Sequence, residues 1–436
     1  MQSKLLNSVS NELDDAQEDP LDSHYAGKIL ESKYDMVDTD VLANNLKHLS
    51  PAQREDLKTL FRKHAKLFNG KLGCYKHRKM HLELEPGAKQ KLRFQRPYSV
   101  SHAHRAVFKQ ELDRLVELGV LTKIGASEHA APTFIIPKKD GRVRWISDFR
   151  ELNSVIKRRV YPLPRISDVL KKRSGYKYFT KLDISMQYYT FELDDESKDL
   201  CSISTPFGTY RYNRAPMGVK QMPDFAQQIM EETLQGIHEQ DAYIDDVGVF
   251  GAPKGSFTDH LVVLDKVLSR LQDANFTINP LKSEWAVQET DFLGFWLTPN
   301  GLKPWKKKVQ AILDLKSPRT VSETRSFIGA VTFYREMFPK HSHILAPLYQ
   351  LTEAKRKGKN RFEWTAACET AFRHVKALLA KDVFIRYPDP NKPFHVYADA
   401  SNIQLGAVIM QDNRPVAYFS RKLNSCLLYT SPSPRD

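Results

Sequence analysis

Two adjacent aspartates, Asp245 and Asp246, interrupt an otherwise apolar run between Ala242 and Phe250. Burying two carboxylates in such a run without partners would be costly. For an Asp-Asp pair alone, a tight turn between two core strands is the more ordinary interpretation. A third carboxylate, Asp183, ends a second apolar run that is predicted to be a strand. Strands that bring carboxylates to the same end of a sheet can bind a divalent metal, and oxygen ligands favour Mg²⁺.

Basic residues precede these carboxylates in a segment with the pattern of a β-hairpin. The dipeptide 140–141, Asp-Gly, lies between two β-prone runs, which is a hairpin signal. Alternation along the second strand puts Arg142 and Arg144 on one face, and Lys138 and Lys139 lie across the turn. Alone, this hairpin is equally consistent with a solvated basic surface. Beside the carboxylates, it favours a clamp for the phosphates of a nucleotide.

Charge is unevenly distributed along the 436 residues. The first 40 residues have a net charge of −7 and the remaining 396 have +21, for a formal total of +14. This excess indicates a polyanionic partner such as nucleic acid, with a merely basic protein as the alternative. The four cysteines form no Cys-x-x-Cys pair, which disfavours a zinc ribbon and favours a reduced, intracellular setting. No apolar run approaches about 18 residues, so no membrane span is expected.

Hydrophobic periodicity predicts a chain that mixes helices and strands. Ser50 and Pro51 have the pattern of a helix start, and Asp194-Asp195 has the pattern of a turn. Further helices are expected at 103–118, 223–236, 260–275, 306–315, 321–338 and 366–380, strands at 176–184, 292–298, 394–399 and 405–411, and a second hairpin at 242–251.

These motifs stand in the order of a known family. The chain resembles the reverse transcriptase of gypsy-type LTR retrotransposons, a region of the Pol polyprotein, from about His48 to Asn424. The matching blocks are Ala131–Asn153 for the fingers, Phe179–Asp183 for the first palm motif, Ala215–Val219 for the template-side motif, Tyr243–Asp246 for the Tyr-x-Asp-Asp signature and Phe292–Phe295 for the primer grip. The signature alone is weak, whereas the blocks in order and at this spacing are specific.

The resemblance implies an α+β right-hand polymerase with fingers, palm and thumb, followed by a connection and the first strands of a ribonuclease H-like domain. It implies a catalytic triad that holds two Mg²⁺ ions, for which Mn²⁺ could substitute: Asp183, Asp245 and Asp246. The other implied site residues are Lys138, Arg144, Tyr188, Met217 and Gly218 for the nucleotide, Asp148 for the fingers, Tyr243 in the signature, Leu293 and Gly294 in the primer grip, and Asp399 in the ribonuclease H-like part.

Tyr188 would be the steric gate against a ribose 2′-hydroxyl, with a core aromatic as the alternative. The chain departs from the family pattern around it. Gln187 stands where related sequences usually have glycine, and a second aromatic follows at Tyr189. Met217 stands where related enzymes carry Phe or Gln, and the stretch 219–223 replaces a run of small residues. These changes could alter nucleotide handling without abolishing the chemistry.

The chain is predicted to divide into segments along this plan. These are a flexible acidic leader (1–45), a helical connector (46–88), the fingers and start of the palm (89–175), the palm (176–300), thumb-like helices (301–350), a connection (351–392), a truncated ribonuclease H-like domain (393–424) and a tail foreign to the family (425–436). After Asp399 the only acids are Asp412 and Asp436, too few for a site that needs several carboxylates, so ribonuclease H activity is expected to be absent.

The resulting hypothesis is an RNA-directed DNA polymerase, a nucleotidyltransferase that extends a primer with dNTPs. Its partners would be an RNA or DNA template, the primer strand and an RNA–DNA hybrid, with no membrane, and its oligomeric state is left open. It would be intracellular and cytoplasmic, inside virus-like particles or outside them. The alternative from another class is a catalytically silent nucleic-acid-binding remnant. An RNA-templated RNA polymerase is disfavoured by Tyr188 and Tyr243.

Overall fold

The carboxylate-bearing strands lie in a four-stranded antiparallel sheet with the order β11-β5-β10-β9. The computed structural model describes residues 36–137, 143–171, 175–252, 255–354, 362–381, 383–401 and 404–423. In this sheet the strands are β5 (Phe179–Asp183), β9 (Gln240–Tyr243), β10 (Asp246–Phe250) and β11 (Glu284–Val287). Every residue of β10 is buried, and the Phe179 and Phe250 rings pack 4.7 Å apart. The sheet therefore forms part of a core and presents its carboxylates at one end.

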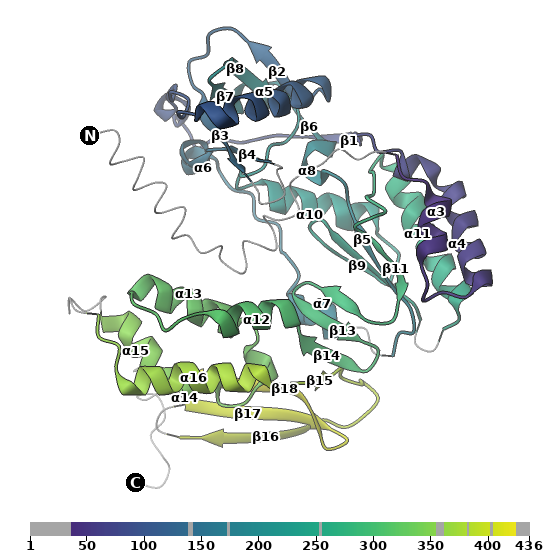
Figure 1. Ribbon diagram of the computed structural model, residues 1–436, viewed down its shortest axis with the longest axis vertical. Helices are drawn as coiled ribbons and strands as arrows, with labels where there is room; N and C mark the ends of the chain where they lie inside the picture. The colour runs from purple at the N-terminus through teal and green to yellow at the C-terminus, as the bar shows by residue number, and fades with distance from the viewer. Residues whose placement is uncertain are drawn as a thin grey trace. The chain divides into compact units, whose positions relative to one another are not determined.

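Two amphipathic helices contact this sheet, α10 (Met222–Thr233) and α11 (Phe257–Asp273) (Figure 1). Both bury apolar residues at helical spacing, such as Leu264, Leu268 and Leu271 in α11. Ser256 begins α11 with a capping box, because its hydroxyl accepts from the Asp259 amide while the Asp259 carboxylate accepts from the Ser256 amide. The predicted helices at 223–236 and 260–275 and the hairpin at 242–251 are confirmed, with small shifts of their ends.

A five-stranded sheet with the order β2-β8-β7-β3-β4 carries the basic hairpin. Its strands are β2 (Leu121–Ile124), β3 (Ala131–Pro137), β4 (Val143–Ser147), β7 (Ser202–Thr205) and β8 (Gly208–Tyr212). Helix α5 (His102–Glu117) packs on it through Phe108, whose ring lies 4.9 Å from Trp145. Strands β3 and β4 pair antiparallel, as predicted, and the turn that joins them lies outside the described residues.

The chain divides into two compact units, described here separately. The described residues of the N-terminal unit lie in 36–169 and 176–288, and those of the C-terminal unit in 170–175 and 289–423. Residues 170–175 belong to the second unit although they interrupt the first in sequence. Lys171 forms an ion pair with Glu336 at 2.5 Å, and the Gly175 amide donates to the Pro299 carbonyl at 3.1 Å.

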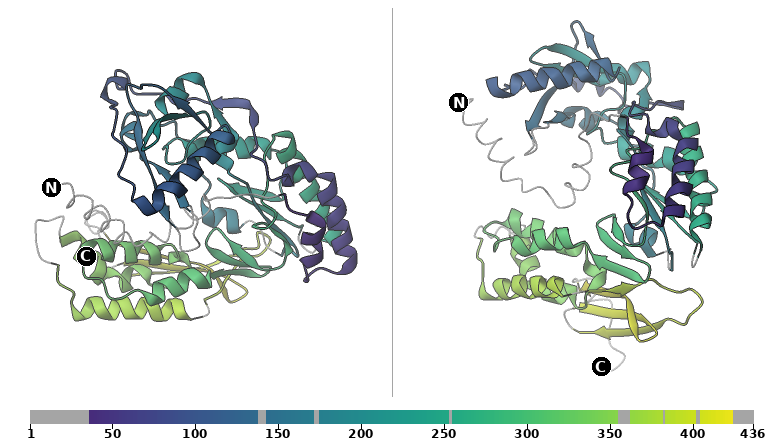
Figure 2. Two further views of the ribbon diagram at one scale, coloured as in Figure 1. Left: turned by 45° about the horizontal axis from the view of Figure 1, so that its top comes forward. Right: turned by 45° about the vertical axis from the view of Figure 1, so that its right-hand side comes forward.

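The C-terminal unit combines two small sheets with helices (Figure 2). The first sheet has the order β12-β13-β14-β15 and the second has the order β16-β17-β18. Their strands are β12 (Thr290–Phe292), β13 (Phe295–Thr298), β14 (Gly301–Pro304), β15 (Ile385–Arg386), β16 (His395–Ala400), β17 (Gln404–Gln411) and β18 (Arg414–Lys422). The helices are α12 (Lys306–Asp314), α13 (Val321–Thr332), η3 (Arg335–Met337), α14 (His341–Ile344), α15 (Ala346–Ala354) and α16 (Ala366–Ala380).

Shorter elements complete the described chain. They are α3 (Thr39–Asn45), α4 (Pro51–Lys63), η1 (Ala65–Phe68), β1 (Tyr75–Met80), η2 (Lys89–Lys91), α6 (Arg150–Val155), α7 (Ile166–Lys171), α8 (Gln187–Thr190), β6 (Phe191–Leu193) and α9 (Asp195–Leu200). Within the described ranges, no helix combines the length and the apolar character that crossing a membrane would require.

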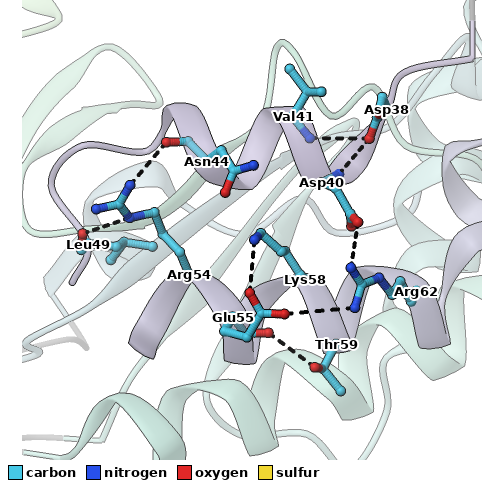
Figure 3. A network of polar contacts seen from close by, with 10 residues as sticks. All are labelled: Asp38, Asp40, Val41, Asn44, Leu49, Arg54, Glu55, Lys58, Thr59 and Arg62. Atoms are coloured by element: carbon cyan, nitrogen blue, oxygen red, sulfur yellow. Dashed lines mark hydrogen bonds and ion pairs between the residues drawn. The ribbon is translucent and has the colours of Figure 1, made fainter. Parts of the chain in front are cut away.

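Several local predictions differ from the structure. The strand predicted at 292–298 is two paired strands, β12 and β13, joined by a turn at Leu293 and Gly294. The helix predicted at 321–338 ends at Thr332. Helix α3 lies inside the segment expected to be a flexible leader, because the Asp38 carboxylate caps it and Asp40 pairs with Arg62 of α4 at 2.5 Å (Figure 3). The rest of that leader, up to residue 35, lies outside the described residues. Asp194-Asp195, expected to be a turn, begins α9, because the Asp194 carboxylate accepts from the Ser197 amide at 2.9 Å.

The start of α4 allows a test of how much its capping box stabilises the protein. Ser50 and Gln53 form a reciprocal capping box, so Ser50→Ala should lower the free energy of unfolding by about 1 kcal/mol. Urea denaturation followed by circular dichroism would measure it. Ser101 is the matched control, because it precedes α5 without a side-chain capping bond. Equal losses in Ser50→Ala and Ser101→Ala would contradict this account.

Candidate active site

The centre of the candidate site is the pairing of β5 with β10. In their antiparallel register, Asp183 lies directly opposite Asp246. Residues opposite each other in such a pair have Cα atoms roughly 4.5–5.5 Å apart, and like charges at these positions repel. Asp246 is 4% exposed, while Asp183 and Asp245 are partly exposed. Two carboxylate residues set opposite each other on paired strands, one of them buried, supply oxygen ligands of the kind that a divalent cation binds.

Asp245 lies beside this pair in the two-residue turn between β9 and β10. Its neighbour Ile244 has a φ of +56° and is 5% exposed. Hairpin turns that need a positive φ at the first central residue normally have glycine there. A β-branched residue in this conformation costs of order 1–3 kcal/mol, so the surrounding structure must hold it in place. The predicted hairpin is therefore present, its turn is formed by Ile244 and Asp245 while Asp246 begins β10, and the turn is strained.

A buried glutamine, Gln227 of α10, holds the turn from one side. Its carbonyl oxygen accepts a hydrogen bond from the Ile244 amide at 2.7 Å, and its amide nitrogen donates to the Ala242 carbonyl at 3.0 Å. Gln227 is fully buried, and the same nitrogen donates to Glu231 at 2.7 Å. Sequence reasoning missed this residue. The sequence did contain a sign of it, because Gln227 stands on the apolar face of the helix, directly after Ala226 and three residues before Met230.

The carboxylates fit a divalent metal in the manner of Mg²⁺, which usually takes one or two protein carboxylates and completes its shell with water and substrate phosphates. Within the described residues, no group of three or more His, Cys, Asp or Glu side chains forms a ready-made metal cage. The opposed pair Asp183 and Asp246, with Asp245 in the adjoining turn, supplies carboxylate oxygens without such a cage.

Tyr188 lies near these carboxylates, and its neighbour Tyr189 packs elsewhere. Both belong to the short helix α8, which follows Met186 with a φ of +44°. Burial raises the pKa of the Tyr188 hydroxyl, and the charge of Asp245 raises it further. The Tyr189 ring instead stacks on that of Tyr212, with centroids 6.4 Å apart. Of the two tyrosines, Tyr188 is therefore the one whose hydroxyl interacts electrostatically with Asp245.

The fingers residues are only partly described. Lys138 lies outside the described residues. Arg144 pairs across the hairpin with Ile136 and is partly exposed, while Trp145 turns into the core and donates from its ring nitrogen to the Tyr212 hydroxyl at 2.9 Å. The predicted alternation of Arg144 and Trp145 across the strand is thus present.

Asp148 joins three parts of the fingers. Its carboxylate accepts from the Tyr98 hydroxyl at 3.0 Å and from the Arg150 guanidinium at 2.6 Å, and its amide donates to the Pro132 carbonyl. The hydrogen bonds from Arg150 lower the pKa of Asp148. A charged Asp148 therefore connects the end of β4 to residues before α5 and at the start of α6, which is consistent with a supporting role.

The segment predicted to be the template-side motif, Ala215–Val219, forms a loop that is held by side-chain hydrogen bonds. Gly218 has a φ of +85° and is exposed, and Met217 beside it is partly exposed. Asn153 of α6 holds this loop, because its amide donates to the Gly218 carbonyl at 2.7 Å and its oxygen accepts from the Lys220 amide at 2.8 Å. A Cβ at position 218 would meet only ordinary contacts within the chain, so the positive φ is what requires glycine here.

In the C-terminal unit, Leu293 and Gly294, the residues predicted to form the primer grip, make the turn between β12 and β13. Their φ values are +48° and +81°, the pair of positive angles that a type I′ hairpin needs. The Tyr334 hydroxyl donates to the Gly294 carbonyl at 2.9 Å. The Lys308 ammonium lies 4.4 Å from the centre of the Phe333 ring, against the same turn. The primer-grip turn therefore rests on an aromatic and cationic support.

Asp399 lies on β16, opposite Gly406 of β17. All six residues of β16 are exposed. Asp412, in the turn that follows β17, forms an ion pair with Lys392 at 2.6 Å. Within the part of the chain that the structure describes, the two acids are therefore not combined in a cluster of metal ligands.

Known proteins resemble this chain over most of its length. Residues 136–297 match the family described as reverse transcriptase (RNA-dependent DNA polymerase), and residues 364–431 match the RNase H-like domain found in reverse transcriptase. The second match begins before Asp399 and continues into the segment 425–436. The "Retrovirus-related Pol polyprotein from transposon 297" of Drosophila melanogaster is 30% identical over 339 residues, which cover 76% of this chain and 31% of the relative.

Two further relatives agree with this match. The Pol polyprotein from Drosophila transposon 412 is 31% identical over 75% of this chain and 26% of its own length. The transposon Tf2-3 polyprotein of Schizosaccharomyces pombe is 28% identical over 78% of this chain and 26% of its own length. The chain thus spans about a third or less of these curated relatives.

Solved structures share the fold. The foamy viral protease-reverse transcriptase in complex with RNA/DNA hybrid covers 91% of this chain and 54% of its own, with a TM-score of 0.77 and 22% identity. The dRH form of that protein in complex with double-stranded DNA covers 95% of this chain and 73% of its own, with a TM-score of 0.80 and 22% identity. The chain therefore has the α+β polymerase fold that the sequence predicted.

The primer-grip turn leads to a stability test. A Cβ at Gly294 would lie 2.9 Å from the Phe333 ring, which is stacked on Phe295 and cannot easily move. With the positive φ added, Gly294→Ala should destabilise the C-terminal unit by about 1–3 kcal/mol. Gly329→Ala is the matched control in α13, where a Cβ meets nothing within 4 Å and helix propensity favours alanine. Thermal unfolding of both variants would measure it, and a Gly294→Ala protein as stable as wild type would refute the packing argument.

Proposed function

Because residues 136–297 are a reverse transcriptase domain, followed by an RNase H-like domain as in retrotransposon Pol polyproteins, we propose that the chain is an RNA-directed DNA polymerase that extends a primer with dNTPs. Reverse transcriptases are nucleotidyltransferases. The structural relatives were solved with an RNA/DNA hybrid and with double-stranded DNA, which supports nucleic acid as the partner. The excess of positive charge after residue 40 supports it independently.

The observation that carries this proposal is the register of Asp246 against Asp183, with Asp245 in the adjoining turn. We expect Asp183 and Asp245, with Asp246 assisting, to hold two Mg²⁺ ions, or Mn²⁺ in their place. When bound, such ions stabilise the attacking and leaving oxygens of an in-line phosphoryl transfer. The primer 3′-hydroxyl would attack the α-phosphorus of the dNTP, and pyrophosphate would leave.

The other site residues would orient the nucleotide and the primer. Arg144 and Lys138 would pair with the triphosphate, since a guanidinium and an ammonium form charge-assisted hydrogen bonds with phosphate oxygens. Tyr188 would exclude a ribose 2′-hydroxyl, and the exposed loop of Met217 and Gly218 would approach the base pair. Leu293 and Gly294 would position the primer end. A cytoplasmic location, inside virus-like particles or outside them, remains a prediction from the sequence.

Primer extension on an oligo(dT)-primed poly(rA) template with Mg²⁺ and dTTP tests the activity. Asp245→Asn should lower the rate by at least roughly a hundredfold, because the amide loses the charge that would hold a metal while keeping the size of the side chain. Asp195→Asn is the control, since Asp195 belongs to another Asp-Asp pair, lies 90% exposed and contacts Lys198. A folded wild-type protein that binds the hybrid without extending it would instead identify a silent remnant.

We further propose that this chain does not cleave the RNA strand of a hybrid. Such chemistry needs several converging carboxylates around two metals, and the acids that follow Asp399 are Asp412, paired with Lys392, and Asp436. A hybrid with labelled RNA should therefore stay intact during DNA synthesis, and Asp399→Asn should change nothing. RNA degradation that Asp399→Asn removes would overturn this proposal.

A further inference from the structure

Gln187 is buried next to the carboxylate site and is not used by any role described so far. It is 4% exposed, and it is the first residue of α8. Its amide nitrogen donates a hydrogen bond to the carbonyl of Ile244 at 2.9 Å. That carbonyl belongs to the peptide bond whose nitrogen is the amide of Asp245. The bond therefore acts on the peptide group that orients a predicted metal-binding carboxylate.

With Gln227, this contact accounts for both backbone hydrogen-bonding groups of Ile244. Gln227 accepts from the Ile244 amide at 2.7 Å, and Gln187 donates to the Ile244 carbonyl. Ile244 needs such support because its φ of +56° is unfavourable for a β-branched side chain. The two glutamines come from different elements, α10 and α8, and are 40 positions apart in the sequence. They form a clamp on the turn, which we call the glutamine clamp.

Packing alone does not explain a glutamine at position 187. Its side-chain oxygen is buried and has no hydrogen-bond partner among the described residues. A buried polar atom without a partner costs free energy, whereas a methionine of similar length would fill the space without that cost. The amide therefore carries a cost that an apolar side chain would avoid, and its one described bond is the bond to Ile244.

Gln187 also precedes Tyr188, the residue expected to discriminate between deoxyribonucleotides and ribonucleotides. Met186, with a φ of +44°, directly precedes Gln187, so the hydrogen bond to the Ile244 carbonyl starts from the residue that follows one unfavourable backbone conformation and ends at another. A shift of α8 would therefore be transmitted to the turn that bears Asp245, and a shift of the turn to Tyr188.

We propose that Gln187 is a positioning residue that couples the nucleotide gate Tyr188 to the carboxylate turn, so that sugar discrimination and metal use depend on one buried amide. This inference rests on the proposed polymerase function. It predicts that removing the amide weakens sugar discrimination and Mg²⁺ use together. A general loss of stability would not change either of these two quantities specifically.

The test compares Gln187→Met with wild type in the full chain. The ratio of kcat/KM for dTTP over UTP should fall roughly five- to tenfold, and the Mg²⁺ concentration for half-maximal extension should rise by a similar factor. Without metal or nucleotide, hydrogen–deuterium exchange at the amides of residues 243–247 should become faster. Gln227→Met should speed the same exchange, because it removes the other half of the glutamine clamp.

Gln411→Met is the matched control. Gln411 is 5% exposed and makes the same kind of bonds in the C-terminal unit, accepting from the Asp389 amide at 2.9 Å and donating to the Asp389 and Lys392 carbonyls. It should lower the melting temperature without changing the dTTP/UTP ratio or exchange at 243–247. If Gln187→Met does not fold, Gln187→Leu removes the donor without adding a charge, and the same shifts are expected.

The outcomes separate this inference from the proposed function. A wild type that does not extend a primer removes the polymerase proposal, and the exchange measurement still decides whether Gln187 holds the turn. An active wild type with Gln187→Met matching it in sugar discrimination, Mg²⁺ dependence and exchange would overturn the inference alone. A Gln187→Met protein that loses only melting temperature, like Gln411→Met, would overturn it as well.

Discussion

Electrostatic repulsion between two carboxylates is the constraint around which the N-terminal unit is arranged. The antiparallel register of β5 and β10 sets Asp183 against Asp246, a pairing that would destabilise an ordinary sheet. The surrounding core supplies the stabilising free energy that this pair lacks. Strand β10 is buried along its whole length, and aromatic rings such as Phe179 and Phe250 pack across the two strands. The free energy of apolar burial thus holds like charges together, and a bound cation would relieve their repulsion.

The conformations of three turns are also fixed by side chains that form hydrogen bonds with the turn backbone. Asn153 pins the loop at Gly218, Tyr334 holds the carbonyl of Gly294, and the glutamine clamp holds Ile244. In each case a residue from another element bonds a turn with a positive φ. Such turns would relax without these bonds, so side chains from elements distant in the sequence fix their geometry.

The elements could be predicted where the signal is local. The helices at 223–236 and 260–275 follow from apolar spacing and the hairpin at 242–251 from its turn, because these patterns involve neighbours in sequence. The glutamine clamp could not, since Gln187 and Gln227 act on Ile244 only after three elements have packed. Asp194 was ambiguous because aspartate favours both turns and helix N-caps. Helix α3 is short, and its Asp40 pairs with Arg62 of a later helix, a contact between distant positions that periodicity does not encode.

Residues 170–175 have a consequence for how this chain can be divided. They belong to the C-terminal unit, where Lys171 and Gly175 are bonded to Glu336 and Pro299, yet both of their flanks belong to the other unit. Within residues 36–423, the backbone therefore passes between the units three times rather than once. No single scission yields two intact pieces, since a fragment that starts at residue 289 lacks this insert. The dependence runs in one direction: a fragment that ends at residue 288 keeps the whole described N-terminal unit, whereas the C-terminal unit is complete only when the chain before residue 289 is present.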